Sequence, residues 1–132
     1  MKKTKTIFYL DDDFDDLGLF KEIVEELGHN VKVFSSGRKM LIFLEIQANK
    51  PDFIFLDIHM PVLNGEEILE IIKKSDDLKD IPVVMVSGAY PKKLLQHCAA
   101  LGVKCLVKRH NFQEFKQNIA DVLKELAATA KA

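Results

Sequence analysis

Hydrophobic residues along this chain recur at two spacings, one typical of buried β-strands and the other of amphipathic helices. Five short apolar runs read as strands, and they cover residues 7–10, 31–34, 53–56, 82–86 and 103–107. Apolar residues between and after these runs recur every three or four positions, which predicts five helices. Their apolar positions span residues 20–27, 40–44, 68–72, 94–101 and 112–126. Strands that alternate with helices favour right-handed crossovers and a parallel sheet.

The polarity of each run predicts its place in the sheet. The first, third and fourth runs are continuously apolar, as expected for strands covered on both faces, whereas the second and fifth alternate, as edge strands can. We therefore expect an α/β fold with a single doubly wound, five-stranded parallel sheet of order 2-1-3-4-5 and five helices. No linker or repeat interrupts the pattern, which predicts one domain over residues 1–132 with a core at about 6–126. Residues 127–132 are expected to fray.

Four of the five runs stop at a polar residue that could take part in chemistry. These residues are Asp11 and its neighbour Asp12, then Asp57, Ser87 and Lys108. Ligands of parallel α/β sheets bind outside the carboxyl ends of the strands. If the runs are neighbouring strands, one pocket receives carboxylates, a hydroxyl and an ammonium group, a set that suits Mg²⁺ and a phosphoryl group.

Five aspartates lie within six positions after the first run. Helix capping or the helix dipole can account for some of them, such as Asp13 and Asp15. It does not account for Asp11 and Asp12 at the end of a central strand, because adjacent carboxylates repel one another unless a cation joins them. Mg²⁺ prefers oxygen ligands and commonly takes one or two carboxylates. The cluster therefore indicates a metal site.

Each of the other three strand-end residues has both a structural and a chemical interpretation. Asp57 could cap a turn, or it could act as a nucleophile that forms an aspartyl-phosphate. Lys108 could be a solvated side chain or a point charge for a phosphoryl oxygen, and Ser87 could form a turn or donate a hydrogen bond to another such oxygen. Their joint occurrence at strand ends favours the phosphoryl site, since phosphoryl transfer needs mainly positioning and charge neutralisation.

Composition excludes several other classes of function. The formal net charge of −1 gives no basic surface for nucleic acid or for a membrane, and no apolar run approaches transmembrane length. Cys98 and Cys105 are the two cysteines, and their spacing matches no metal motif. Two reduced thiols suit a cytoplasmic protein.

The segments FYLDDD, FIFLDIHMPVLNG, PVVMVSGA and LVK follow one another in an order and spacing that resemble the receiver domain of two-component response regulators. The resemblance extends from about residue 6 to residue 126. It implies that Asp57 is the phosphoacceptor and that Asp12 binds Mg²⁺ directly, with Asp11 assisting. It also implies that the backbone carbonyl of His59 completes the metal site.

The same resemblance implies roles for the remaining strand ends and for partners. Ser87 matches the switch hydroxyl, and Lys108 matches the invariant lysine of the family. The phosphoryl group is expected to come from a histidine kinase or a histidine phosphotransfer protein. Phosphorylation is then expected to shift a pre-existing equilibrium in the face formed by the fourth helix, the fifth strand and the fifth helix, where an output protein binds.

The chain departs from the family pattern near the lysine and the acceptor. Arg109 follows Lys108 where the family usually has a cis-proline, and a non-proline cis bond is costly, so we expect a trans bond or an altered loop. Cys105 stands where the family has its switch aromatic, so the usual hydroxyl–aromatic coupling cannot operate. His59 and Ala89 border the acceptor, and we expect the His59 side chain to be exposed.

Three functional hypotheses follow. The first is a stand-alone receiver without an output domain, which signals through protein contacts or relays its phosphoryl group. The second is a degenerate receiver that binds partners without phosphorylation. The third is a small phosphatase of the haloacid dehalogenase type, which is disfavoured because that class has a second aspartate where this chain has His59. The first hypothesis describes a signalling domain rather than an enzyme.

Overall fold

Strands and helices alternate throughout the computed structural model, which describes residues 4–60, 63–88, 92–108 and 111–130. The strands are β1 (Thr6–Leu10), β2 (Asn30–Phe34), β3 (Phe53–Asp57), β4 (Val83–Ser87) and β5 (Lys104–Val107). The helices are α1 (Phe14–Glu26), α2 (Gly37–Ile46), α3 (Gly65–Lys74), α4 (Lys92–Leu101) and α5 (Phe112–Ala130). The predicted alternation of strand and helix is confirmed.

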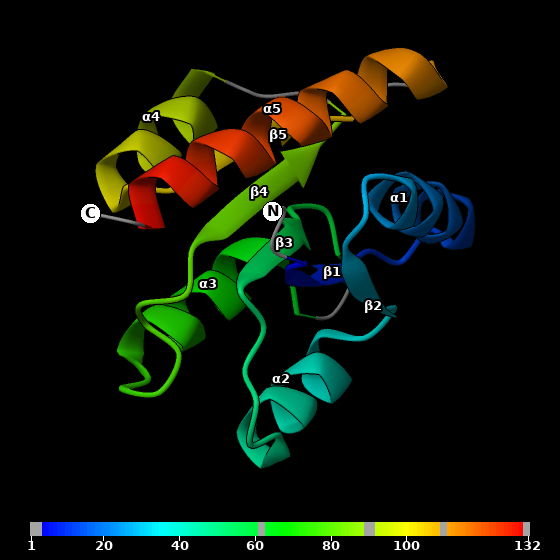
Figure 1. Cartoon of the computed structure of the whole chain (residues 1–132). Helices are drawn as coiled ribbons and strands as arrows, with labels where there is room; N and C mark the ends of the chain where they lie inside the picture. Colours follow the sequence, from blue (N-terminus) through cyan, green and yellow to red (C-terminus); the bar gives the residue numbers. More distant parts are fainter. Residues whose placement is uncertain (1–3, 61–62, 89–91, 109–110, 131–132) are drawn as a thin grey trace.

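The five strands form one parallel sheet in the order β2-β1-β3-β4-β5 (Figure 1). Every residue of β3 and β4 is buried, and β1 is buried from its second residue onward. The edge strands β2 and β5 are only partly buried. The predicted order is confirmed, and burial explains it, because the continuously apolar runs occupy the strands that have helices on both faces.

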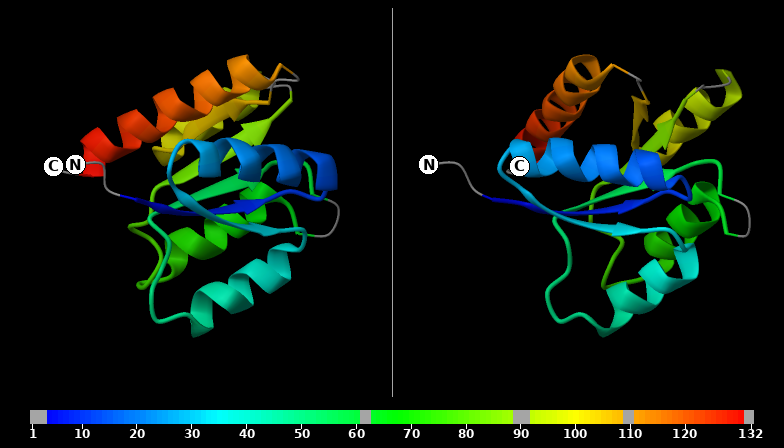
Figure 2. Two further views of the ribbon diagram at one scale, coloured as in Figure 1. Left: turned by 45° about the vertical axis from the view of Figure 1, so that its right-hand side comes forward. Right: turned by 90° about the vertical axis from the view of Figure 1, so that its right-hand side faces the viewer.

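Two hydrophobic cores lie on opposite faces of the sheet. One contains Phe20 of α1 and Ile119 of α5. The other contains Met40 of α2, Ile68 of α3 and Cys98 of α4. Figure 2 shows α1 and α5 on one side of the sheet, with α2 and α3 on the other. Both faces of the central strands are therefore covered, which leaves the strand ends as the place where polar side chains can meet.

Local sequence signals fix several helix ends. Asp13 caps α1 by accepting hydrogen bonds from two backbone N–H groups of the first turn. Asn64 and Glu67 form a reciprocal capping box at the start of α3. Gly28 and Gly102 follow α1 and α4 with φ values of 92° and 71°, a left-handed conformation that glycine adopts without strain.

The expectation that the chain frays after residue 126 is wrong for its first part. Helix α5 continues through residues 127–130. Among the α5 side chains whose burial the structure describes, Leu126 is the last deeply buried one, so packing gives little reason for the extension. The added segment is mostly alanine, which has the highest intrinsic helix propensity, and it prolongs a helix that already exists.

Candidate functional site

The register of the central strands brings two aspartates to the same edge of the sheet. Leu10 of β1 pairs with Leu56 of β3, so Asp11 and Asp57 are the next residues on neighbouring parallel strands. Asp11 is fully buried, and Asp57 is 3% exposed. An oxygen of each carboxylate lies within 4.8 Å of one of the other, and the charge of Asp11 raises the pKa of Asp57. Two acids are thus enclosed at the carboxyl end of the sheet, where the sequence predicted a site.

The neighbouring strands β4 and β5 bring Ser87 and Lys108 to this edge. Ser87 is the last residue of β4 and is fully buried. Its backbone carbonyl accepts a hydrogen bond of 2.8 Å from the backbone N–H of Lys108, the residue that follows β5. The four predicted strand ends therefore converge.

Three carboxylates form a cluster that could hold a cation. Each of Asp11, Asp12 and Asp57 offers an oxygen atom, and these atoms all lie within 4.8 Å of one another. Asp12 is exposed, whereas the other two are buried, so the cluster opens to solvent through Asp12. Hard oxygen ligands with an open side are what Mg²⁺ and similar cations prefer.

Three donors hold Asp11, and one of them is the hydroxyl of Tyr9, for which the sequence predicted no role. The Tyr9 hydroxyl donates a hydrogen bond of 2.5 Å to Asp11 Oδ2, and the backbone N–H of Asp13 donates one of 3.0 Å to Oδ1. Lys108 Nζ lies 2.8 Å from Oδ2. Tyr9 belongs to an apolar run, and such a position predicts a core residue. A signal existed, since Tyr9 and Asp11 are two positions apart and residues at that spacing in a strand share a face.

Lys108 contacts three carboxylates rather than one. Its Nζ lies 2.8 Å from Asp11, 2.9 Å from Asp16 and 3.4 Å from Asp57. Asp16 lies in the first turn of α1, and its partner is 92 positions away along the chain. The sequence predicts no role for Asp16 beyond its membership of the acidic segment.

Burial and charge set the protonation of these groups. Burial is the largest cause that raises the pKa of Asp57, to about 6, and the charge of Asp11 adds to it. Burial also acts to raise the pKa of Asp11, but the hydrogen bonds from Lys108 and Tyr9 outweigh it and leave that pKa below its usual value. Burial acts to lower the pKa of Lys108, but the adjacent carboxylates raise it above its usual value. Lys108 therefore stays cationic.

The backbone that follows Asp57 packs closely around it. The N–H of His59 donates a hydrogen bond of 3.2 Å to Asp57 Oδ1, and the His59 side chain is exposed, as expected. The start of α3 packs directly on the end of β3. A Cβ atom at Gly65 would lie 2.5 Å from the Asp57 carbonyl oxygen. Only glycine fits there without displacing the backbone that presents Asp57.

A sequence model described as the response regulator receiver domain matches residues 7–120, most of the chain. The chain belongs to this family. Response regulator Rcp1 of Synechocystis sp. is 29% identical to this receiver domain over 118 residues, which cover 83% of this chain and 80% of that protein. The family consists of signalling domains that interact with histidine kinases and with output proteins.

Solved structures agree with this assignment. The phosphorylated cyanobacterial phytochrome response regulator RcpA superposes with a TM-score of 0.83 and 28% identity, covering 96% of each chain. The manganese-bound form of response regulator Rcp1 superposes with a TM-score of 0.74 and 28% identity, covering 86% of this chain and 87% of that one. This receiver domain therefore has a close structural counterpart in a phosphorylated state and another in a metal-bound state.

The departures from the family pattern are only partly described by the structure of this receiver domain. Arg109 and Ala89 lie outside the described residues. Cys105 is half-buried in β5 and interacts with the buried thiol of Cys98 in α4. Burial, followed by that contact, raises the pKa of Cys105 to about 12. A small uncharged thiol thus occupies the position of the family's switch aromatic.

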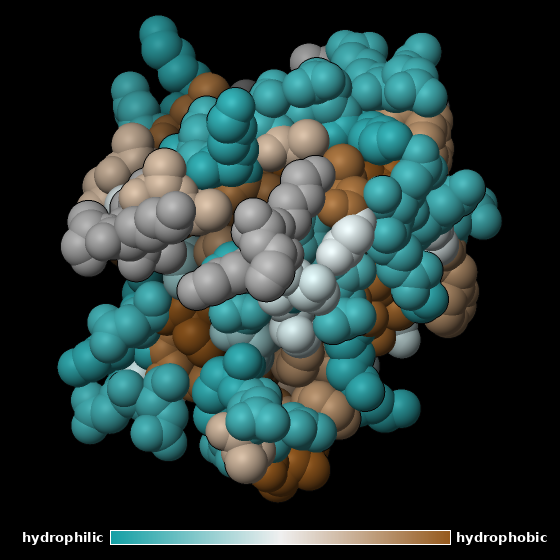
Figure 3. Space-filling view, viewed as in Figure 1, coloured by the Kyte–Doolittle hydropathy of each residue, from teal (hydrophilic) through white to brown (hydrophobic). Residues whose placement is uncertain are grey.

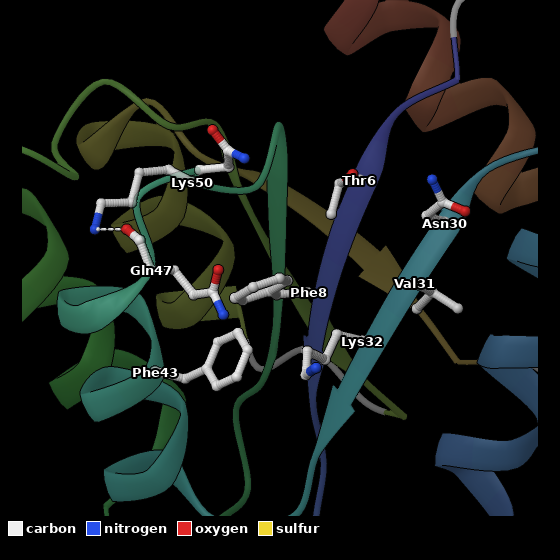
Figure 4. A pocket seen from close by; sticks show the side chains of 9 residues that line it. Thr6, Phe8, Asn30, Val31, Lys32, Phe43, Gln47 and Lys50 are labelled. Carbon is white, nitrogen blue, oxygen red and sulfur yellow. Dashed lines mark hydrogen bonds between the residues drawn. The ribbon is translucent and has the colours of Figure 1, made fainter.

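A hollow of about 270 Å³ lies at the end of the sheet opposite to Asp57, where β1 and β2 begin (Figure 4). The two lysines that line it have partners. Lys50 Nζ donates to the backbone carbonyls of Leu44 and Gln47 at the end of α2, the latter at 2.6 Å. Lys32 Nζ lies 4.4 Å from the centre of the Phe43 ring. These contacts show that both lysines serve the packing of α2 against the sheet. The hollow lies apart from the acidic cluster.

Among the described residues, no helix of this receiver domain is long and apolar enough to span a membrane. Figure 3 shows that hydrophilic residues cover much of one face, with a hydrophobic patch over α2 at the bottom of the view. Ile42 and Ile46 are the exposed apolar side chains of that helix. Phe14, at the start of α1 beside the acidic cluster, is 77% exposed.

Proposed function

We propose that this receiver domain accepts one phosphoryl group on Asp57 from a histidine kinase or a histidine phosphotransfer protein, in a Mg²⁺-dependent reaction. The observation that carries the proposal is the arrangement around Asp57. A buried carboxylate at the end of a central strand lies against a second carboxylate and 3.4 Å from the ammonium group of Lys108. Such a group is positioned as a nucleophile, and its surroundings supply the charges that phosphoryl transfer needs.

The covalent step exchanges one bond to phosphorus for another. A carboxylate oxygen of Asp57 attacks the phosphorus atom of a phosphohistidine, a P–O bond forms and the P–N bond breaks. The imidazole leaves with the electron pair of that bond and takes up a proton. Above pH 6 Asp57 is ionised and ready to attack, because its raised pKa is about 6. Lys108 stays charged and can neutralise an oxygen of the transferred group.

The residues of the acidic cluster fit a divalent cation. Three oxygens converge, and one of the acids, Asp57, has a pKa raised by burial and by the charge of Asp11, which a cation would relieve. We propose that Asp12, Asp57 and the His59 carbonyl hold Mg²⁺. Asp11 would act less directly, since its oxygens already accept from three donors. When bound, Mg²⁺ supplies positive charge that offsets the carboxylates and the phosphoryl oxygens.

We propose that phosphorylation of Asp57 is transmitted through Ser87 to the face formed by α4, β5 and α5, where an output protein binds. Ser87 is buried at the end of β4, next to the strand that carries Asp57, which suits a hydroxyl that detects a phosphoryl group. Cys105 takes the place of the aromatic partner, so the coupling through that side chain differs from the family's usual form.

Exposed Phe14 offers an apolar contact to the protein that brings the phosphoryl group.

The proposal also covers the domain as a whole. We propose that residues 6–126 act as one receiver domain that signals by protein contacts or by phosphorelay. The two free thiols suit a reducing compartment such as the cytoplasm.

The decisive experiment measures intact mass after incubation with Mg²⁺ and a small phosphodonor such as phosphoramidate. The expected result is a gain of one acid-stable, base-labile phosphoryl group in the wild type and none in Asp57→Asn. The absence of any adduct with several donors would favour the degenerate receiver. Continuous hydrolysis of phosphomonoesters would favour the phosphatase. An unchanged melting temperature on addition of Mg²⁺ would contradict the metal site, because a ligand that binds the folded state stabilises it.

A further inference from the structure

We infer that Asp16 is a positioning residue that holds the Lys108 ammonium group away from Asp57 in the unphosphorylated state and competes with the phosphoryl group for it. The inference rests on the proposed function, since it concerns the lysine that would contact the phosphoryl group. It goes beyond the family resemblance, which assigns no role to this position.

The distances show where Lys108 is held. Its Nζ atom is 2.9 Å from Asp16 Oδ2 and 2.8 Å from Asp11 Oδ2, but 3.4 Å from Asp57 Oδ2. The first two distances are those of close charged hydrogen bonds, whereas the third is longer. Lys108 is thus drawn toward Asp11 and the first turn of α1.

The number of donors explains why the contacts compete. A lysine ammonium group has three N–H donors and no acceptor. Three carboxylates lie within ion-pair distance of Lys108, as many as it has donors, before any phosphoryl group arrives. The Lys108 side chain is 21% exposed, and that of Asp16 is 33% exposed, so water screens this pair only partly. A phosphoryl oxygen can therefore accept a hydrogen bond from Lys108 only if one of these ion pairs weakens.

Asp16 differs from Asp11 in what else it does. Asp11 is fully buried and also accepts from Tyr9 and from the backbone of Asp13, so its replacement would disturb the end of β1. Asp16 lies on α1, and among the described residues its carboxylate bonds only to Lys108. Replacement of Asp16 therefore changes the position of Lys108 with little effect on the rest of the site.

The chain contains a matched control for this test. Asp15 is adjacent, carries the same charge and also lies in the first turn of α1, but it is exposed and no described contact joins it to Lys108. Asp15→Asn therefore reproduces the loss of one charge near the acidic cluster and the loss of one helix-dipole acid. A difference between Asp16→Asn and Asp15→Asn isolates the contact with Lys108.

The experiment compares four full-length proteins, the wild type, Asp16→Asn, Asp15→Asn and Asp16→Glu. Calorimetry in the presence of Mg²⁺ measures the affinity for beryllofluoride, which mimics a phosphoryl group on a carboxylate. Phosphorylation by phosphoramidate is followed in parallel and separated into the maximal rate and the half-saturating donor concentration. Urea unfolding of the same proteins reports any general loss of stability.

Asp16→Asn is expected to bind beryllofluoride roughly three- to fivefold more tightly than the wild type, the size expected for loss of a competing, partly exposed ion pair. Asp15→Asn should stay close to the wild type, and Asp16→Glu should restore most of the wild-type affinity. The half-saturating donor concentration should fall in Asp16→Asn in proportion.

Two results would overturn this inference while leaving the proposed function intact. Equal affinities of Asp16→Asn and Asp15→Asn would show that the contact with Lys108 has no influence on phosphoryl binding. Weaker binding by Asp16→Asn, with unchanged stability, would show that Asp16 delivers Lys108 to the phosphoryl group rather than withholding it. If the wild type itself neither binds beryllofluoride nor takes up a phosphoryl group, the proposed function fails and this inference fails with it.

Discussion

Replacement of Asp57 by asparagine is expected to stabilise the metal-free protein. Asp57 is almost completely buried and lies against the ionised carboxylate of Asp11. The ionised form of Asp57 is therefore unfavourable in the folded state, even though Lys108 lies 3.4 Å away. Asparagine has nearly the shape of the protonated acid and cannot ionise. The site is thus arranged for charge chemistry at the expense of stability, a feature of many functional sites.

The pKa of Asp57 gives the size of this effect. It rises from 3.8 to about 6. A shift of about two units corresponds to roughly 3 kcal/mol, which includes the attraction of Lys108. Since the folded-state pKa is raised, the stabilising effect of protonation is fully present below pH 3.8 and is lost as the pH rises through 6. Asp57→Asn should therefore exceed the wild type in stability by up to roughly 3 kcal/mol at about pH 7.5, and by less than about 1 kcal/mol near pH 4.

Urea unfolding followed by circular dichroism, with a chelator present, measures the difference directly. Comparison of two proteins at each pH cancels most of the other titrating groups, including Asp11, whose lowered pKa has the opposite pH dependence. Asp15→Asn removes an exposed charge of the same sign and serves as the control, with an expected change of less than about 0.5 kcal/mol. Addition of Mg²⁺ should stabilise the wild type more than Asp57→Asn.

The reasoning would be refuted if Asp57→Asn were no more stable than the wild type at about pH 7.5. It would equally be refuted if the gain grew, rather than shrank, on acidification. Either result would mean that Lys108 compensates Asp57 fully and that no repulsion is stored at the end of β3.

Three further substitutions or reactions test other parts of the account. Gly65→Ala places a Cβ atom 2.5 Å from a backbone oxygen at the end of β3, and should cost about 1–3 kcal/mol in urea unfolding and slow phosphorylation. Gly37→Ala, whose Cβ meets mainly the tip of a flexible isoleucine side chain, should cost less, and equal costs would argue against the close fit. Tyr9→Phe removes a donor from the buried carboxylate of Asp11 and should destabilise the protein by about 1–3 kcal/mol, with a neutral result counting against the hydrogen bond. Cys105, with a pKa of about 12, should react with iodoacetamide at least about tenfold more slowly in the folded protein than in urea, and equal rates would contradict its burial.

The fold could be predicted from the sequence because periodicity and burial are linked. Runs that are apolar at every position must be covered on both faces, and that condition placed β1, β3 and β4 in the middle of the sheet. The end of α5 could not be predicted in the same way. Its last residues are held by helix propensity rather than by packing, and periodicity gives no signal for such a segment.

The convergence of the strand-end residues was predicted from the sequence, whereas contacts that depend on the direction of a side chain were missed. Asp57 and Ser87 end their strands, and Asp11 and Lys108 directly follow theirs, so the parallel order alone brings the four together. The contact of Asp16 with Lys108 joins the first helix to the last strand, and neither spacing nor composition reveals it. The same three-dimensional contact gives Asp16 the role inferred above.

The most direct test of the central claim locates the phosphoryl group. The protein is incubated with Mg²⁺ and phosphoramidate, and the acyl phosphate is reduced with borohydride, which converts a phosphorylated aspartate to homoserine. Tandem mass spectrometry of the peptides that contain residues 11 and 12 and residue 57 then identifies the modified residue. The account predicts homoserine at position 57, at a level that falls when Mg²⁺ is chelated. Homoserine at position 11 or 12 instead, or none at any position, would contradict it.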